Sequence, residues 1–321
     1  MLKESEGRRR TAGIKRKKRL KKSVKITLGV LVLICAIAGY LYLNYYMSTH
    51  SQMGYGEVDD AVVESDQTLI DDELGKETTS LTAKYTILDV EGEAILIQIG
   101  NTDCLIDTGS EASASKLVQA LHDKVKGNLE YVILTSEDPG RTGGIKALYK
   151  DKQLKIENTI VGELGSSRKL IDELADKSSV TEGESSTIEL EGNATLSIFK
   201  PEISTADVKN KSLMVGFTHG DTKFLSLSDA GIEEEAKLIG IYDKVDVLVL
   251  GRYGSNKSNN VVFNERYAVA SIKDASAIAN EVLLRHSNVF ATGKSGEIVF
   301  TSDSALVTTE VKSSDVVKPK E

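Results

Sequence analysis

The sequence predicts an α/β protein with a mixed sheet, held at a membrane by its amino-terminal part. Three observations predict this arrangement. A nearly unbroken apolar run covers residues 26–43. From Lys84 onward, short apolar segments typical of buried strands alternate with segments whose apolar residues recur at helical spacing. These segments form two strand-rich halves, each closed by helices, as in α/β folds.

The apolar run and its flanks predict an uncleaved membrane anchor. About 20 apolar residues span a bilayer as a helix, so we assign residues 26–46 to a transmembrane helix. Residues 1–25 hold twelve Lys and Arg against Glu4 and Glu6, which places the amino terminus in the cytoplasm. Tyrosines follow the run, as at a membrane interface. A cleaved signal peptide is the alternative, although its apolar core is usually about 7–15 residues long.

The next segment, residues 47–81, is acidic and rich in Ser and Thr, without sustained periodicity. We interpret it as a solvated linker, which makes everything after it extracytoplasmic. Subtracting the tail's twelve basic and two acidic residues from totals of 40 and 48 leaves 28 and 46, a net charge of −18. Such an acidic bulk argues against non-specific nucleic-acid binding. Cys35 and Cys104 both lie in apolar segments, so no disulfide is expected.

Strands are predicted where runs rich in Val, Ile, Leu and aromatic residues end at Gly, Asn or Asp, and helices where apolar residues recur every three or four positions. In the first half these elements are strands at 84–90, 93–100 and 103–109, a helix at 113–125, strands at 128–135 and 159–162, and a helix at 166–176. In the second half they are strands at 186–193 and 194–200, a hairpin at 212–229, a helix at 232–242, a strand at 245–251, a helix at 274–286, and strands at 288–292 and 297–302. The GKSGE segment at 293–297 lacks the spacing of a phosphate loop, so we expect a hairpin turn there.

The most informative motif is VILTSEDPGRTGG at residues 132–144. It resembles the LTHPDADHIGG loop of the metallo-β-lactamase superfamily, in particular the C-terminal hydrolase-like domain of ComEC/Rec2 competence (DNA-uptake) proteins. In that family two histidines and two aspartates of this loop hold metal ions. Here the resemblance places Ser136 and Arg141 at the histidine positions and Gly140 at the second aspartate. Asp138 alone is retained.

Other landmarks of the same family follow along the chain, from about residue 85 to 303. CLIDTGS resembles the family's LIDTGG and keeps Asp107, and FLSLSDAG resembles FLLTGDAG and keeps Asp229. VDVLVLGRYGS resembles a segment in which paired histidines stand where Arg252 and Tyr253 lie here. The positions matching the family's metal site are therefore Asp107, Ser136, Asp138, Gly140, Arg141, Asp229, Arg252 and Tyr253.

The resemblance implies a metallo-β-lactamase-like four-layer αββα sandwich. We divide the chain into a cytoplasmic basic tail (1–25), a transmembrane helix (26–46), an acidic linker (47–81), a degenerate metallo-β-lactamase-like domain (82–305) and a tail (306–321). Turn glycines and core positions persist at these landmarks, whereas the histidines are absent. Zinc sites need His, Cys or carboxylate donors, and an arginine repels a cation.

No other residues are placed to rescue a transition-metal site or a nucleophile. The four histidines, His50, His122, His219 and His286, fall at no ligand landmark, and we expect surface or capping roles for them. The three retained aspartates without histidine suit a hard cation better than zinc. A simpler expectation is that Arg141 pairs with one of them and plugs the vacated site, with Arg252 as the second candidate.

The sequence therefore predicts a membrane-anchored extracytoplasmic pseudoenzyme without a cofactor, a binding or scaffolding domain that acts by protein contact at the cell envelope or by binding a ligand in the vacated cleft. One alternative is a hydrolase of phosphodiesters or nucleic acid that holds Zn, Mn or Mg through the retained carboxylates. Another is a helper in DNA uptake that grips nucleic acid without cutting it. Fold resemblance does not carry function when the site itself has changed.

Overall fold

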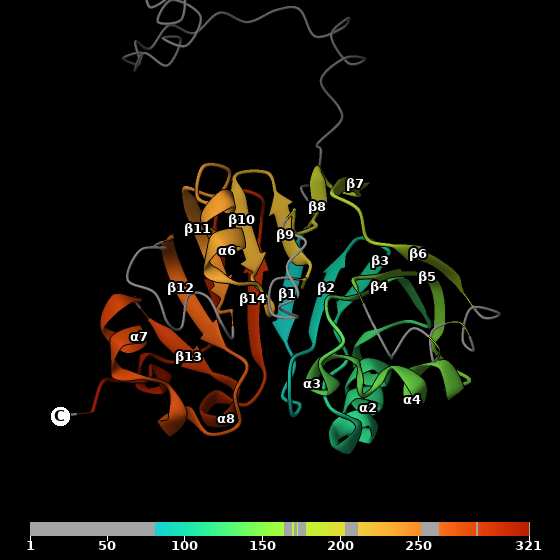
Figure 1. Cartoon of the computed structure of the whole chain (residues 1–321), viewed down its shortest axis with the longest axis horizontal. Coiled ribbons are helices and arrows are strands. Elements are labelled where there is room, and N and C mark those ends of the chain that lie inside the picture. Colours follow the sequence, from blue (N-terminus) through green and yellow to red (C-terminus); the bar gives the residue numbers. More distant parts are fainter. Residues whose placement is uncertain are drawn as a thin grey trace, which may run out of the picture. The chain divides into compact units, whose positions relative to one another are not determined.

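The computed structural model describes residues 81–163, 169, 172, 178–202, 211–251, 263–286 and 288–320 (Figure 1). All of these belong to one compact unit, residues 76–321. The predicted tail, transmembrane helix and nearly all of the linker lie outside the described residues. So do the expected helix at 166–176, of which only two positions are described, and Arg252 and Tyr253. Within the described part, no helix is long and apolar enough to cross a membrane.

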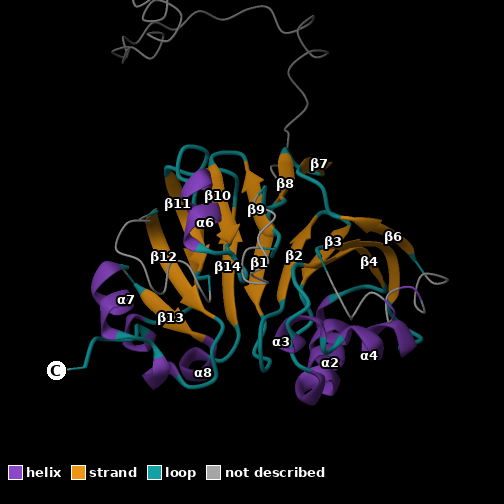
Figure 2. Ribbon diagram, viewed as in Figure 1, coloured by secondary structure: helices purple, strands orange, loops and turns teal. Residues whose placement is uncertain are grey.

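Two mixed sheets carry the described fold (Figure 2). The first has the order β15-β14-β1-β2-β3-β4-β5-β6 and the second β13-β12-β11-β10-β9-β8-β7. The strands of the first sheet are β1 (Ala83–Ile87), β2 (Ile95–Ile99), β3 (Thr102–Ile106), β4 (Asn128–Leu134), β5 (Lys155–Val161), β6 (Ser179–Glu182), β14 (Ile298–Ser302) and β15 (Val307–Thr309). Those of the second are β7 (Ser186–Leu190), β8 (Ala194–Phe199), β9 (Met214–His219), β10 (Thr222–Ser226), β11 (Lys244–Val249), β12 (Asn264–Ala270) and β13 (Val289–Ala291).

Short helices connect the strands. The described α-helices are α2 (Ala114–Lys124), α3 (Pro139–Thr142), α4 (Ile145–Lys150), α6 (Ile232–Leu238), α7 (Asn280–Arg285) and α8 (Thr292–Ser295). Three 3-10 turns accompany them, η1 (Glu111–Ser113), η5 (Ala275–Ala277) and η6 (Ser313–Asp315). The helix expected at 274–286 is thus divided into η5 and a shorter α7. Asp274 caps η5 by accepting a hydrogen bond from the Ser276 amide.

Successive side chains of each strand point to opposite faces of its sheet, and this alternation builds three apolar layers. Ile95 and Ile97 face the second sheet and pack in the central core, whereas Leu96 points outward toward α2 and α4. In the second sheet Phe224 faces the centre and Leu225 faces α6 and α7. The inner and outer positions thus follow the period of two expected for strands. Helices cover the outer faces of both sheets, so the predicted four-layer αββα arrangement is confirmed.

Two segments differ from the sequence prediction. The GKSGE segment was predicted to be a hairpin turn, but its first part is the single helical turn α8. A hairpin is impossible because β13 belongs to the second sheet and β14 to the first, so the chain crosses between sheets here. Close packing explains Gly293, since a Cβ there would lie 1.8 Å from the Lys273 carbonyl oxygen.

The segment assigned as a carboxy-terminal tail, residues 306–321, is instead part of the fold through residue 320, whose backbone exchanges hydrogen bonds with the Asn280 side chain. It contributes β15, which pairs antiparallel with β14. The Val317 amide donates to the Val289 carbonyl over 2.8 Å, which joins this segment to β13. Val311 and Val316 pack against the central core. Their apolar side chains explain why the segment returns to the domain rather than remaining in solvent.

The end of β9 also joins the two sheets. His219 at the end of β9 is fully buried, and its Nδ1 lies 2.8 Å from the Ser302 hydroxyl of β14. Burial lowers the pKa of His219. The sequence prediction of a surface or capping histidine was therefore wrong here, because the hairpin turn that carries it packs against the other sheet.

Candidate functional site

The retained family positions meet where several strands end. Asp107 follows β3, Thr135 and Ser136 follow β4, and Asp229 follows β10. Strands β3 and β4 are parallel neighbours, so their carboxyl ends lie side by side. Asp229 comes from the second sheet and Asp107 from the first. The site therefore lies between the two sheets.

Arg141 projects from α3, a single turn directly after β4. Asp138 caps this turn, because its Oδ1 accepts a 2.7 Å hydrogen bond from the Gly140 amide. Pro139 occupies the first helical position, where its missing N–H costs nothing. The turn directs Arg141 inward, and only 3% of this residue is exposed. A guanidinium is rarely buried to this degree unless carboxylates surround it.

Three carboxylates surround the Arg141 guanidinium. Its Nε donates to Asp229 Oδ2 over 2.8 Å. Its Nη1 donates to Asp107 Oδ2 over 2.8 Å and to Glu93 Oε1 over 2.6 Å. Each of the three acidic residues is at most 5% exposed. We call these four residues the Arg141 cluster. The expected Arg–Asp pair is present, and Asp107 and Asp229 share the arginine.

Hydroxyl groups complete the cluster. Ser136 Oγ donates to Asp229 Oδ2 over 3.0 Å, so this serine supports a carboxylate. Asp107 accepts hydrogen bonds from the Thr135 amide and hydroxyl over 2.8 and 2.7 Å. Ser226 of β10 donates to Glu93 Oε1 over 3.2 Å. Residues of both sheets therefore satisfy the buried charges, as such charges require.

The charges in this cluster do not balance. Three ionised carboxylates and one guanidinium would leave an excess of two negative charges in a buried site. Burial raises the pKa of Asp107 to about 7, although Arg141 opposes that shift. Burial would lower the pKa of Arg141, but Glu93, Asp107 and Asp229 together raise it well above its ordinary value. The guanidinium is thus the fixed charge of the site, and Asp107 is the group that takes up a proton near neutral pH.

Glu93 is the cluster member that sequence reasoning missed. It lies two residues before β2, where an acidic residue is expected to face solvent in a turn. Gly92 instead lets the β1–β2 loop approach α3 closely, because a Cβ at this position would lie 1.9 Å from the Gly140 carbonyl oxygen. That carbonyl accepts the Glu93 amide over 3.0 Å, which ties the β1–β2 loop to α3. The sequence does contain a feature that could have identified Glu93, because the Gly92-Glu93 pair precedes a continuous apolar strand.

Not every predicted position joins the cluster. Asp138 is half-buried and caps α3, and Gly140 contributes backbone groups. Arg252 and Tyr253 lie outside the described residues. Among the histidines, His122 pairs with Asp151 over 3.1 Å, and His286 pairs with Glu265 over 3.0 Å in a buried contact. His286 is the C-cap residue of α7, one of the two roles expected for it, and its side chain is buried beside Glu265 of β12. Among the described residues, no group of three or more His, Cys, Asp or Glu is arranged to hold a metal ion.

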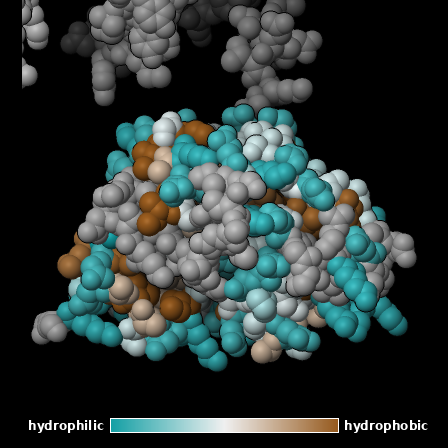
Figure 3. Space-filling model, in the orientation of Figure 1, coloured by the Kyte–Doolittle hydropathy of each residue, from teal (hydrophilic) through white to brown (hydrophobic). Residues whose placement is uncertain are grey.

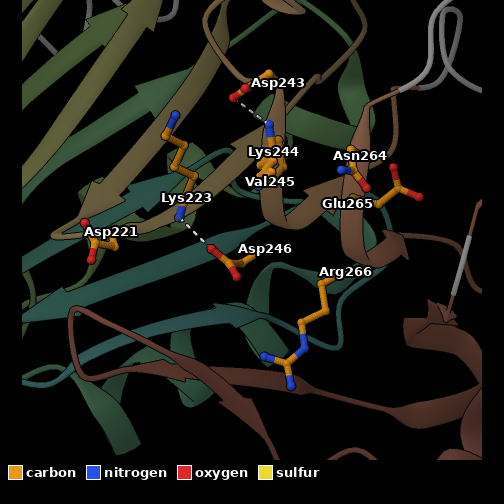
Figure 4. Close-up of a pocket in the computed structure, with 9 residues that line it drawn as sticks. All are labelled: Asp221, Lys223, Asp243, Lys244, Val245, Asp246, Asn264, Glu265 and Arg266. Atoms are coloured by element: carbon orange, nitrogen blue, oxygen red, sulfur yellow. Dashed lines mark hydrogen bonds between the residues drawn. The ribbon is translucent and has the colours of Figure 1, made fainter. Parts of the chain in front are cut away.

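The described surface has an open pocket of about 430 Å³ away from the Arg141 cluster (Figure 4). It is formed where β10, β11 and β12 begin, at the edge opposite the cluster. Acidic and basic side chains alternate around it, including Asp243, Lys244, Asp246 and Arg266. The Lys223 amide donates to Asp246 there, and the Lys244 amide to Asp243. These contacts hold the strand ends in place.

Comparisons with known proteins concern the fold alone. No family model matches the chain, and no curated protein matches it. One similar solved structure is the metallo-beta-lactamase fold protein YhfI from Bacillus subtilis, with 13% identity, a TM-score of 0.48, and coverage of 65% of this chain and 95% of that one. A diphosphatase from the PhnP family has 13% identity, a TM-score of 0.47, and coverage of 69% and 98%. MEM-A1, a subclass B3 metallo-beta-lactamase from a soil metagenome library, has 11% identity, a TM-score of 0.40, and coverage of 56% and 80%.

The cluster predicts a large effect of removing its arginine. Arg141→Ala leaves three buried carboxylates without a counter-charge. Breaking a buried pair in this way typically costs about 3–5 kcal/mol, against about 0–1 kcal/mol for a surface pair. We expect a clear fall in melting temperature and in the urea midpoint, measured by circular dichroism.

The matched control for this change is Lys146→Ala on the neighbouring helix α4. Lys146 is exposed and makes no ion pair in the described part of the chain. Its removal is expected to leave the melting temperature nearly unchanged. Equal losses for the two variants would contradict the assignment of Arg141 as a buried structural charge.

Proposed function

We propose that this protein is a membrane-anchored extracytoplasmic pseudoenzyme of metallo-β-lactamase fold, degenerate in its metal site and acting as a binding or scaffolding domain at the cell envelope. The observation that carries this proposal is the position of the Arg141 guanidinium. It lies within 2.8 Å of oxygens of Asp107 and Asp229, the two carboxylates that the resemblance assigns to metal binding. A cation bound to both carboxylates would have to displace it.

The residues at this site do not fit a transition-metal centre. Zinc sites use His, Cys or carboxylate donors in a tetrahedral set. Ser136, Gly140 and Arg141 stand where the family has donors, and the Ser136 hydroxyl is directed at Asp229. The remaining carboxylates are already engaged by a guanidinium and hydroxyls. We therefore assign no metal-dependent step to this site.

No nucleophile is activated by a base in the cluster either. Ser136 donates to Asp229 and accepts a 3.3 Å hydrogen bond from the Asp138 amide, and no histidine contacts it in the described part of the chain. A serine nucleophile requires a base that removes its proton, usually a histidine. This arrangement supports a structural role for Ser136.

The alternative is a hydrolase of phosphodiesters or nucleic acid that uses a hard cation. The three buried carboxylates favour this reading, because oxygen ligands suit Mg²⁺ or Mn²⁺. Such an enzyme requires Arg141 to leave the cluster. A third candidate, a non-cutting helper in DNA uptake, rests on the resemblance alone.

Metal analysis distinguishes the pseudoenzyme from the hydrolase. We expect the purified full chain to contain no stoichiometric zinc, manganese or iron by mass spectrometry. A chelator is expected to leave the melting temperature unchanged, because no metal-binding free energy is linked to folding. One equivalent of tightly held metal, together with a chelator-induced fall in melting temperature, would overturn the proposal.

A second test concerns the proposed topology. The basic residues before the apolar run and the tyrosines after it predict an exported domain. Protease added to intact cells or spheroplasts is expected to digest the domain, while a cytoplasmic marker protein survives. Complete protection of the domain would place it on the other side of the membrane.

A further inference from the structure

The segment that follows β15 crosses one side of the sandwich as a strap. It leaves β15, an edge strand of the first sheet, and reaches β13, an edge strand of the second. We call residues 310–320 the strap. Most of its residues are exposed, and the half-buried ones are Val311, Asp315, Val316 and Val317. The strap therefore lies on the surface of the domain.

Groups of the second half hold the strap by its backbone. The Val289 carbonyl of β13 accepts the Val317 amide over 2.8 Å. The Lys294 ammonium group on α8 donates to the carbonyls of Ser314 and Val316 over 3.1 and 2.9 Å. Each of these contacts involves a main-chain group of the strap, which nearly every residue type can supply.

The end of the strap is bound in the same way. The Asn280 side chain, at the start of α7, accepts the Lys320 amide over 2.9 Å and donates to the Lys320 carbonyl over 3.1 Å. A side-chain amide thus pairs with both backbone groups of one residue, as a neighbouring strand does. The strap runs beside α7 here (Figure 1). We call the surface formed by Asn280, Val289 and Lys294 the strap-binding surface.

Two adjacent valines show which side chains fit this surface. Val316 packs against the central core, and Val317 packs against the outer apolar layer of the second sheet. The two side chains therefore point to opposite sides of the backbone, as in an extended strand. Main-chain hydrogen bonds combined with alternating side-chain contacts are typical of peptide recognition by strand addition. The surface suits an extended segment with two adjacent apolar residues.

Apolar surface next to the strap is left uncovered. Leu284 lies one helical turn from Asn280 on the same face of α7, and it is 75% exposed. Hydrophobic surface is visible in this part of the molecule, at the lower left of Figure 3 over α7 and β13. A bound segment that also covers Leu284 would bury more apolar surface than the strap does, and such burial favours binding.

The strap is held less firmly than the strand before it. Val307 of β15 is fully buried, whereas the valines of the strap are half-buried. Asn280 and Lys294 are exposed, so water competes for their hydrogen bonds to the strap. Segments with few buried apolar contacts open locally, at a free energy well below that of global unfolding. The strap can therefore leave its surface while the sheets stay folded.

We propose that the strap-binding surface docks an extended segment of a partner protein, with two adjacent apolar residues, and that the strap occupies this surface until such a segment displaces it. This assignment rests on the proposed function as a binding domain, and it names the chemistry of the partner. The strap acts as an internal competitor, because a partner binds only the molecules whose surface is open.

The probe for this proposal is a fluorescent peptide with the sequence of residues 311–320, VKSSDVVKPK. Its binding to the purified full chain is measured by fluorescence anisotropy. The V316S/V317S variant weakens the internal strap and leaves the strap-binding surface unchanged. We expect this variant to bind the peptide at least about tenfold more tightly than the unmodified chain, because its own strap competes less. Equal binding to the two chains, or no binding to the variant, would overturn the proposal.

Two controls test the contacts themselves. A peptide with serine in place of both valines, VKSSDSSKPK, is expected to bind V316S/V317S at least about tenfold more weakly. Adding Lys294→Met to this variant is expected to weaken peptide binding about fivefold or more, because it removes the donor to two strap carbonyls. Adding Lys146→Met on α4 instead removes the same charge elsewhere and is expected to change Kd by less than about twofold. Equal affinities of the two peptides, or equal effects of the two lysine changes, would contradict the assigned contacts.

Hydrogen exchange on the unmodified chain provides a test that does not depend on how a variant folds. The Val317 amide is expected to exchange at least about a hundredfold faster than the amides of the central strand β1, because the strap opens locally. Exchange of the Val317 amide at the slow rate of the β1 amides would show that the strap opens only when the whole domain unfolds. The surface would then not be open to a partner.

Sedimentation velocity on the same preparations identifies a different occupant. We expect the unmodified chain to be a monomer, because the strap occupies the surface of its own molecule. A dimer that dissociates in V316S/V317S would assign the surface to the strap of a second copy and contradict the choice of a partner protein. Metal content is measured on the same preparations, so a failure of the pseudoenzyme assignment is seen separately from a failure of the strap-binding surface.

Discussion

The buried guanidinium of Arg141 is the interaction on which the described site depends. It contacts Glu93 and Asp107 from the first sheet and Asp229 from the second, and Ser226 extends the network into β10. Neither the carboxylates nor the arginine is accessible enough for water to solvate it. The buried guanidinium charge is stable here only because the carboxylates surround it, and the carboxylate charges are stable only because the guanidinium is present. The arginine thus holds the two sheets together at the edge where the resemblance expects metal ions.

A guanidinium lies here between two carboxylates, Asp107 and Asp229, that the resemblance assigns to metal binding. A divalent metal needs several donors and is lost to chelators, whereas a guanidinium is attached to the chain and remains charged at every accessible pH. The residues around Arg141 fix its position and that of Asp229. Asp138 caps α3 and so aims Arg141, and Ser136 orients Asp229.

The sequence predicted the central features of this site and missed others for physical reasons. Periodicity identified most strands, and the retained landmarks placed Asp107, Arg141 and Asp229 together. Glu93 was missed because an acid before a strand is ordinarily solvated, and its burial depends on Ser226, 133 residues later. The buried His219 and the strand β15 were missed for the same reason. The residues that pack against His219 and β15 are distant from them in the sequence, so a local sequence pattern cannot predict these contacts.

The central claim is that Arg141 and Asp229 are energetically coupled across the two sheets. A double-mutant cycle with Arg141→Met and Asp229→Asn, measured by urea unfolding of the full chain, tests this most directly. We expect the double variant to lose clearly less stability than the two single losses combined, because Asp229→Asn removes one of the three carboxylates that Arg141→Met leaves without a counter-charge. The coupling is expected to exceed about 1 kcal/mol, above the value for an exposed pair. Additive losses, within about 0.5 kcal/mol, would contradict the account.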